Sequence, residues 1–197
     1  ARRGGVVSTP RIISGKARGI RLSDVPGNIT RPITDMVKTA LFNILGEDIV
    51  GSSMLDLFGG TGSVGIEALS RGAEFVRFID LNHPAVATIK ANLEKTRLKD
   101  GAEVLQMDAY ALLRQRPDRQ FDYIYVAPPQ YKGMWQRALE ELDKNPDWMS
   151  EGAWVVVQID PVEHEERSFQ HFQKLEERKY GNTLLIFYEQ GEAEKSE

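Results

Sequence analysis

Short apolar runs alternate with helical patterns along most of this 197-residue chain. The apolar runs are rich in β-branched and aromatic residues, which favour strands, and the segments between them place apolar residues at helical spacing. The expected strands are residues 54–58, 75–80, 102–107, 121–126 and 153–159. Strand, helix and strand repeated this often predict an α/β fold, with helices on both faces of a mostly parallel sheet.

The C-terminal part departs from this alternation. Two strand-like runs flank Tyr180, Gly181 and Asn182, a pattern typical of a hairpin. The hairpin would add antiparallel pairing at one edge and bring the expected sheet to seven strands. The segment GEAEKSE (191–197) is charged and small, so we expect a disordered tail there.

The N-terminal part carries a pattern of its own. The segment RIISGKARGIRL (11–22) alternates around a Gly-Lys turn and predicts a small basic β-hairpin. The segment ITDMVKTALFNIL (33–45) has helical spacing, and Thr34 is its expected N-cap. The expected organisation is an N-terminal basic arm over residues 1–33, a main domain over 34–190 and the tail over 191–197.

The charges of the chain are unevenly distributed. Residues 1–40 carry eight basic and two acidic residues, a balance of 8 − 2 = +6, and the chain's net charge of −4 leaves −10 for the remainder. A basic arm on an acidic body is typical of a protein that binds the phosphate backbone of a nucleic acid. The alternative is a solvated, poorly ordered N-terminus without a partner. The basic residues are Arg2, Arg3, Arg11, Lys16, Arg18, Arg21, Arg31 and Lys38.

The composition excludes several kinds of site. The chain has no cysteine, which excludes disulfides, thiolate zinc sites and cysteine nucleophiles, and we expect no metal site. No apolar run approaches the roughly 20 residues that cross a bilayer, so we expect a soluble protein without a membrane partner.

A glycine-rich loop follows the first expected strand and opens a helix, in the segment DLFGGTGSVGIEAL (56–69). The spacing of Gly60, Gly62 and Gly65 matches G-x-G-x-x-G, in which glycines permit a tight turn, close approach to a ligand and helix packing. Asp80 ends the second strand 20 residues later, where a carboxylate would bind ribose hydroxyls. This pattern fits a dinucleotide or another nucleoside-bearing cofactor such as S-adenosylmethionine.

Two further carboxylates favour S-adenosylmethionine. Asp56 lies within the first strand, where it could meet an ammonium group, whereas a pyrophosphate would be repelled there. Asp108 follows the third strand and could accept a hydrogen bond from an adenine amino group. The alternatives are that Asp56 caps amides of the loop and that Asp108 is a helix N-cap.

A double-proline corner follows the fourth strand in the segment FDYIYVAPPQY (121–131). Ligands of a doubly wound sheet bind at the carboxyl ends of the strands, beside the glycine loop. Pro128 and Pro129 remove two backbone donors and free the preceding carbonyls to face a ligand, and Tyr131 could stack on a base. Such acceptors suit methylation of an exocyclic amine, because they can hold its N–H groups and aim its lone pair. The alternative is that the prolines only end the strand.

With both motifs in place, the chain resembles the RsmD-type methyltransferases, from about Arg11 to Gln190. The resemblance is carried by RIISGKARGIRL, TRPITDMVKTALFNIL, LDLFGGTGSVGIEALSRGA and the proline corner. It implies a class I Rossmann-like fold and S-adenosylmethionine as the methyl donor. The implied reaction is methylation of N2 of a guanine in small-subunit ribosomal RNA, and the implied partner is this RNA or the small ribosomal subunit. We expect a monomer in the cytoplasm, with the stroma of a plastid or another bacterial-type organelle as the alternative, because the chain begins with Ala1 rather than methionine.

The resemblance also implies roles for particular residues. The cofactor contacts would be Asp56, Phe58, Gly59, Gly60, Thr61, Gly62, Asp80, Leu81, Asn82, Asp108 and Ala109. The catalytic corner would be Ala127, Pro128, Pro129, Gln130 and Tyr131. The RNA contacts would be Arg11, Lys16, Arg18, Arg21, Arg31 and Thr34.

The proline corner departs from the family pattern, in which an acid or amide precedes Pro-Pro and an aromatic residue follows. Here these two positions hold Ala127 and Gln130. Either Gln130 supplies the acceptor, or the backbone suffices, or the protein binds RNA as a ribosome-assembly factor without methylating it; we favour the first two. A nicotinamide-dependent oxidoreductase is the remaining alternative, although no suitably placed Tyr and Lys pair is evident.

Overall fold

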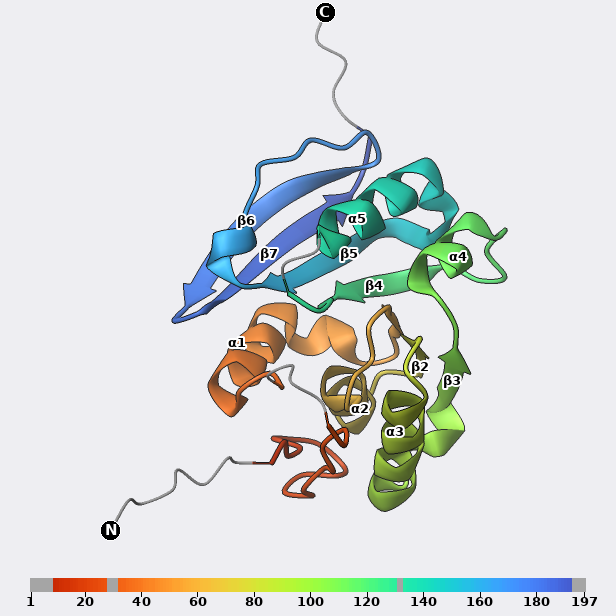
Figure 1. Ribbon diagram of the computed structural model, residues 1–197, viewed down its shortest axis with the longest axis vertical. Helices are drawn as coiled ribbons and strands as arrows, with labels where there is room; N and C mark the ends of the chain where they lie inside the picture. The colour runs from red at the N-terminus through yellow and green to blue at the C-terminus, as the bar shows by residue number, and fades with distance from the viewer. Residues whose placement is uncertain (1–8, 28–31, 131–132, 193–197) are drawn as a thin grey trace, which may run out of the picture.

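The computed structural model describes residues 9–27, 32–130 and 133–192. Seven strands form one sheet in the order β3-β2-β1-β4-β5-β7-β6 (Figure 1). The first five strands are parallel, and β7 and β6 add antiparallel pairing at one edge. The predicted α/β fold with a C-terminal hairpin is confirmed. The strands are β1 (Ser53–Asp56), β2 (Phe75–Asp80), β3 (Ala102–Gln106), β4 (Phe121–Val126), β5 (Met149–Ile159), β6 (Phe172–Tyr180) and β7 (Thr183–Gln190).

Helices cover both faces of the sheet. The α-helices are α1 (Asp35–Leu45), α2 (Ser63–Ser70), α3 (His83–Thr96), α4 (Ala109–Arg114) and α5 (Met134–Lys144). Short 3-10 turns are η1 (Gly46–Ile49), η2 (Lys99–Gly101), η3 (Pro146–Trp148) and η4 (Pro161–Glu163). Because side chains alternate along a strand, neighbouring residues enter different cores. Leu55 and Ile124 pack with α4 and α5, whereas Met54 and Tyr123 pack with α1, α2 and α3.

The segment expected to form a basic β-hairpin pairs with itself without forming regular strands. Arg11 and Arg21 form an isolated antiparallel bridge, and the N–H of Ile12 donates to the carbonyl of Ile20 over 2.9 Å. The apolar side chains of Ile12 and Leu22 are buried in the core shared by α1, α2 and α3. Residues 9–27 therefore lie against the main domain, and their basic side chains project from a fixed surface.

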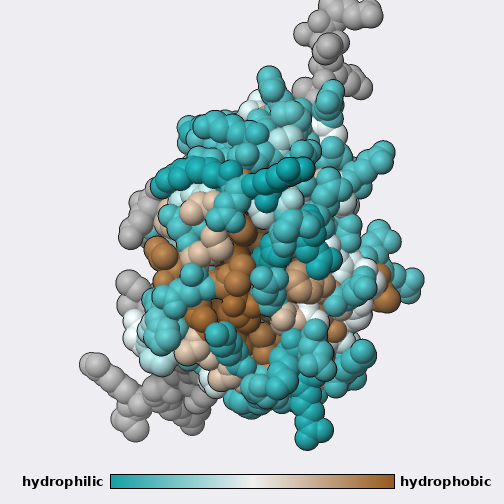
Figure 2. All heavy atoms as spheres, turned by 90° about the vertical axis from the view of Figure 1, so that its right-hand side faces the viewer, coloured by the Kyte–Doolittle hydropathy of each residue, from teal (hydrophilic) through white to brown (hydrophobic). Residues whose placement is uncertain are grey.

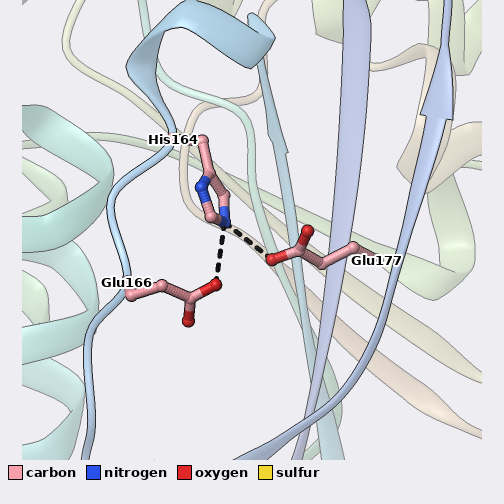
Figure 3. Close-up of side chains that lie close together, drawn as sticks. All are labelled: His164, Glu166 and Glu177. Carbon is pink, nitrogen blue, oxygen red and sulfur yellow. Dashed lines mark hydrogen bonds and ion pairs between the residues drawn. The ribbon is translucent and has the colours of Figure 1, made fainter.

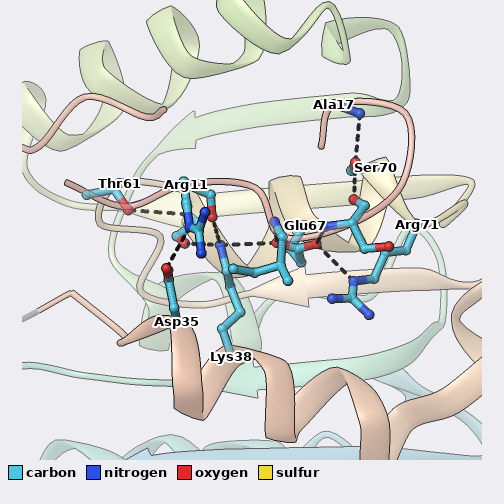
Figure 4. Close-up of polar contacts among 11 residues, drawn as sticks. Arg11, Ala17, Asp35, Lys38, Thr61, Glu67, Ser70 and Arg71 are labelled. Atoms are coloured by element: carbon cyan, nitrogen blue, oxygen red, sulfur yellow. Dashed lines mark hydrogen bonds and ion pairs between the residues drawn. The ribbon is translucent and has the colours of Figure 1, made fainter. Parts of the chain in front are cut away.

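A buried ion pair fixes this segment (Figure 4). Glu67 of α2 has no exposed surface, and its carboxylate accepts hydrogen bonds from the backbone N–H groups of Ile13 and Ser14 over 2.8 and 3.1 Å. The ammonium group of Lys38 from α1 and the guanidinium group of Arg71 lie 3.1 and 2.9 Å from the same carboxylate. Glu67 thus joins α1, α2 and the N-terminal segment.

The edge formed by β3 has a different surface. Figure 2 looks onto the side of the molecule that carries β3, where hydrophobic surface is framed by hydrophilic side chains. A cavity of about 380 Å³ there is lined by residues of α3, η2 and β3. Among the described residues, none of the helices has the length and apolar character needed to cross a membrane.

Candidate active site

The glycine loop and the proline corner meet at the carboxyl ends of neighbouring strands. β1 lies between β2 and β4, which is where the connections of the sheet turn in opposite directions. The N–H of Leu57 donates to the carbonyl of Tyr125 over 3.1 Å, so the start of the loop remains paired with β4. The expected strand 54–58 ends at Asp56, because Phe58 and the glycines already belong to the loop.

Asp56 is a buried carboxylate with one unpartnered oxygen. The side chain is 1% exposed, and its Oδ1 atom has no hydrogen-bond partner in the described part of the chain. Burial raises the pKa of Asp56 to about 7; the hydrogen bond from the backbone N–H of Phe58 opposes this shift, and the charge of Asp80 adds to it. An oxygen left in this state costs free energy unless a donor or a cation reaches it. Asp56 therefore caps one loop amide, and its other oxygen has no donor among the described residues.

Asp80 holds the glycine loop against the end of β2. Its Oδ2 atom accepts a hydrogen bond from the N–H of Gly60 over 3.0 Å, and its Oδ1 atom accepts from the N–H of Asn82 over 2.9 Å. Gly60 has a φ of +58°, in the left-handed region that favours glycine, and a side chain built there would meet no atom within 4 Å. The loop thus turns at Gly60 beside open space, and Asp80 fixes that turn.

Packing constrains two other glycines of this segment to different degrees. A side chain built at Gly65 would lie 2.3 Å from the ring of Phe78, and one at Gly59 would lie 2.7 Å from Ile89. At Gly65 the ring of Phe78 and the side chain of Val76 leave no room for a side chain, so α2 approaches the sheet closely because glycine is there. At Gly59 the obstacle is the end of the flexible Ile89 side chain, which could shift. This is the packing role expected for Gly65.

The residues expected around a nucleoside lie in two short segments. Leu81 is 68% exposed, and Asn82 is the N-cap residue of α3 without a side-chain capping bond. Asp108 caps α4, since its Oδ1 atom accepts from the N–H of Tyr110 over 2.8 Å. Ala109 has its methyl group in the core, so it offers only its backbone. Asp108 is therefore a helix N-cap, which was the alternative considered for it, and its second carboxylate oxygen takes no part in the capping bond.

Phe58 gives the glycine loop an aromatic wall. Its ring packs edge-on against Tyr110 of α4, with centroids 6.3 Å apart. Thr61 is held from the other side, because the amide of Asn92 donates to its carbonyl over 2.9 Å. The loop is thus bounded by α4 on one side and α3 on the other.

The proline corner leaves β4 at the same edge. Ala127 and Pro128 are half-buried, and Pro129 and Gln130 are exposed. The amide of Gln130 makes no side-chain hydrogen bond to another described residue, and the residue is exposed. Tyr131, the expected stacking residue, lies outside the described residues.

Gln158 of β5 is a polar neighbour of this corner that the sequence analysis missed. Val126 of β4 pairs with Val157 of β5, so the next step of the parallel register places Gln158 beside Ala127. The hydroxyl of Tyr125 donates to Oε1 of Gln158, and burial, followed by the charge of Asp56, raises the pKa of Tyr125 well above its usual value. A lone glutamine within the apolar run WVVVQI was the available signal.

Comparisons with known proteins identify the family of this chain. The family described as conserved hypothetical protein 95 matches residues 10–189. The Bacillus subtilis protein named "Putative rRNA methyltransferase YlbH" is 40% identical over 152 residues, covering 76% of this chain and 82% of that protein. "Ribosomal RNA small subunit methyltransferase D" of Haemophilus influenzae is 35% identical over 153 residues, covering 76% and 78%. The chain belongs to the RsmD-type family.

The structural comparison extends the similarity over nearly the whole chain. The solved structure of "Putative methyltransferase yhhF" from Escherichia coli superimposes with a TM-score of 0.82 and 28% identity, covering 92% of this chain and 97% of that one. The resemblance inferred from the motifs is therefore confirmed at the level of family and fold.

The basic residues of this RsmD-type protein differ in how far they are engaged. Arg11 pairs with Asp35, with Nε and Oδ2 2.7 Å apart. Lys16, Arg18 and Arg21 are exposed, and no ion pair holds them among the described residues. Of the other expected RNA contacts, Thr34 caps α1 by accepting from the N–H of Val37 over 3.3 Å. Arg31 lies outside the described residues, as do Arg2 and Arg3.

A cluster with metal-ligating side chains lies away from this site (Figure 3). Nε2 of His164 is 2.6 Å from Glu177 and 3.5 Å from Glu166. The ammonium group of Lys174 lies 2.8 Å from Glu166 and 3.0 Å from Glu177, so the two carboxylates already share a cation. Charge pairing accounts for this cluster, and the absence of a metal site stays a prediction.

Proposed function

We propose that this protein methylates the exocyclic N2 amine of a guanine in small-subunit ribosomal RNA, with S-adenosylmethionine as the methyl donor. The observation that carries the proposal is the buried Asp56 carboxylate with its unpartnered oxygen. This carboxylate lies at the same sheet edge at which the proline corner follows β4. Relatives named as small-subunit ribosomal RNA methyltransferases support the substrate class.

The residues present fit this cofactor. The free Oδ1 atom of Asp56 suits the ammonium group of the methionine part, which would satisfy an otherwise orphaned buried oxygen. The open space beside Gly60 leaves room for the ligand against the loop backbone. Asp80 would bind the ribose hydroxyls through lone pairs not used by Gly60 and Asn82. Asp108 would meet the adenine edge with the oxygen that does not cap α4.

The proline corner would hold the amine that receives the methyl group. The lone pair of an exocyclic amine is delocalised into the base and is a poor nucleophile. The carbonyls of Ala127 and Pro128, each followed by a proline, would accept from the N–H groups and turn the lone pair out of conjugation. The bound cofactor supplies a methyl group on a sulfonium. The corner would hold the nitrogen with its lone pair toward that methyl group, and solvent would take the proton that the nitrogen loses.

Gln130 is our leading choice for the side-chain acceptor. Its carbonyl oxygen would take the part of the acid or amide that Ala127 replaces, because its side chain is exposed at the corner. Gln158 would position the corner from β5, since its amide is fixed by Tyr125 beside Ala127. A catalytically impaired RNA-binding assembly factor is the second candidate, and Ala127 is the residue that favours it.

The RNA would lie along the basic N-terminal segment. Lys16, Arg18 and Arg21 have no protein partner for their charges among the described residues, so phosphates can engage them without breaking an ion pair. Glu67 and Lys38 hold that segment in place beside the glycine loop. The fixed segment would orient a guanine toward the corner.

Transfer of labelled methyl groups to isolated small subunits tests the function. We expect transfer by the native protein and none by Gly60→Arg, whose side chain would fill the space beside the loop at a backbone position with a positive φ. Binding of S-adenosylmethionine without transfer to subunits or free ribosomal RNA would favour the assembly factor. If the native protein did not bind S-adenosylmethionine, the proposal would be refuted.

A charge-matched pair of variants tests the RNA surface. Arg18→Ala/Arg21→Ala should lower the slope of log affinity against log salt by about 1 to 2, because each phosphate contact contributes nearly one to the slope. The control, Arg116→Ala/Lys179→Ala, removes two exposed charges that have no ion-pair partner among the described residues. Cofactor affinity should stay unchanged in both variants. Equal salt slopes would show that the segment does not contact RNA.

A further inference from the structure

A second cavity lies at the opposite end of the sheet from the candidate active site. Its volume is about 440 Å³, and it is lined by the end of α1, the η1 turn with the residues that follow it, the start of β4 and the first half of β5. It therefore opens at the amino ends of the strands, whereas the glycine loop and the proline corner follow their carboxyl ends. None of its residues has a part in the proposed methyl transfer.

The lining of this cavity is acidic. It includes the carboxylates of Asp48, Asp122 and Glu151, and none of its residues is a lysine, arginine or histidine. Among the described residues, the donors to the Asp122 carboxylate are neutral: the N–H and hydroxyl of Ser53 over 3.0 and 3.4 Å, and the hydroxyl of Ser150 over 2.8 Å. Asp48 and Glu151 are exposed and form no ion pair with the described residues. The cavity thus holds negative charge that no cation of the described residues neutralises.

Tyr123 adds an unpartnered polar group to this cavity. Its side chain is 7% exposed, and its hydroxyl makes no hydrogen bond with any described residue. Burial first, and then the charges of Asp48 and Asp122, raise the pKa of Tyr123 to about 12, so the hydroxyl stays protonated. A hydroxyl that lines a cavity without a partner among the described residues can bond to a ligand there.

An aromatic wall completes the lining. The indole of Trp154 is half-buried, and its ring packs edge-on against Phe187 with centroids 5.9 Å apart, which fixes its orientation. Aromatic faces beside carboxylates attract organic cations, because the ring quadrupole and the negative charges act in the same direction.

We propose that this cavity binds an organic cation that carries a primary ammonium or guanidinium group. Asp48 and Glu151 would neutralise the charge, Tyr123 would accept a hydrogen bond from its N–H groups, and Trp154 would cover its alkyl part. A compact metal ion fits less well. The carboxylates of the cavity do not converge, since the one set of three potential ligands within 4.8 Å of one another in the described part of the chain is that of His164.

Two sources could supply such a cation. One is a free polyamine, and the other is a lysine or arginine side chain of a partner protein. The probes are therefore spermidine, and the capped amino acids acetyl-lysine amide and acetyl-arginine amide. If a free polyamine is the ligand, spermidine should bind more tightly than either capped amino acid. If a protein side chain is the ligand, one of the capped amino acids should bind at least as tightly as spermidine.

Tryptophan fluorescence can report binding at this cavity. Trp135 and Trp148 are 0% and 1% exposed, so Trp154 is the indole that a ligand can reach. We expect a saturable change on titration of the native protein at low salt. Asp48→Asn/Glu151→Gln should weaken binding about tenfold, from the loss of two carboxylates near the ligand. Tyr123→Phe, which removes an unpartnered hydroxyl without changing the packing, should weaken it about threefold.

A charge-matched control separates the cavity from general attraction. Glu47→Gln/Glu74→Gln removes two exposed carboxylates outside the cavity and should keep the native affinity within about twofold. Equal weakening in the control and the cavity variant would overturn the proposal. So would an equal response to magnesium chloride, or no saturable response to any of the three probes.

Discussion

Replacing Asp56 with asparagine should change the pH dependence of stability in the cofactor-free protein. Burial raises the pKa of this carboxyl from 3.8 to about 7 in the folded state. The folded protein therefore binds the proton more tightly than the unfolded chain does. The associated stability is fully present below the unfolded pKa and is lost as the pH rises through about 7. A shift of about 3 pKa units corresponds to about 4 kcal/mol of unfolding free energy.

Asparagine removes this titration and adds a smaller, constant cost. Its oxygen can still accept from the N–H of Phe58, while its NH2 group takes the place of the unpartnered Oδ1 atom. An unsatisfied buried amide costs about 1 to 3 kcal/mol. Asp56→Asn should therefore be less stable than the native protein by about 2 kcal/mol at pH 4 and more stable by about 2 kcal/mol at pH 8.

Thermal unfolding without cofactor at pH 4 and pH 8 measures this reversal. For a chain of this size the expected difference is a melting-temperature shift of about 5 °C in opposite directions at the two pH values. Asp108→Asn is the control, because asparagine can also cap α4 and the carboxylate there accepts from Tyr110. If Asp56→Asn lost the same stability at both pH values, the argument that burial controls Asp56 would be refuted.

The same carboxyl should control cofactor affinity. If the ionised form of Asp56 receives the ammonium group, affinity of the native protein for S-adenosylmethionine should fall about tenfold for each pH unit below about 7. Calorimetric titration measures this slope. Asp56→Asn should bind S-adenosylmethionine weakly, with an affinity that does not change with pH in this range. A flat profile in the native protein would show that Asp56 does not bind the ammonium group.

The remaining predictions concern the buried ion pair and the proline corner. Lys38→Met should destabilise the protein by about 3 kcal/mol in urea unfolding, because it leaves the buried carboxylate of Glu67 with Arg71 as its remaining cation. Adding Glu67→Leu should recover part of this loss. If the losses of the two single variants simply added in the double variant, this account would be contradicted. Gln130→Ala should lower kcat about tenfold or more without changing the dissociation constant of S-adenosylmethionine, and an unchanged kcat would exclude Gln130 as the acceptor. Gln158→Ala should also lower kcat, but Gln158→Glu, which keeps the oxygen bonded to Tyr125, should restore part of it.

Local patterns predicted most of the elements. Residues 75–80 and 121–126 coincide with β2 and β4, because both segments are rich in the β-branched and aromatic residues that favour strands. The observed strand boundaries differ from the expected ones where strand pairing, rather than local composition, decides where a strand begins or ends. β1 ends at Asp56, and β5 begins at Met149 rather than at residue 153, since Met149 pairs with Phe121 across a shift in register.

The N-terminal segment was the least predictable part. Its charges suggested an arm, but Ile12 and Leu22 are buried, and the backbone before Gly15 bonds to Glu67. No local pattern marks a helical glutamate as the partner of a segment more than fifty residues earlier in the chain. Burial of a charged side chain depends on groups that only folding brings together.

The sequence by itself determined the order of strands and helices, the glycine loop and the proline corner, because these follow from spacing, side-chain shape and backbone freedom within a few residues. The tertiary structure decided the state of Asp56 and the position of Gln158. The first depends on how completely neighbouring elements exclude water from one oxygen. The second depends on the register between β4 and β5, which lie far apart along the chain. Both are properties of contacts between distant segments, and residue spacing does not encode them directly.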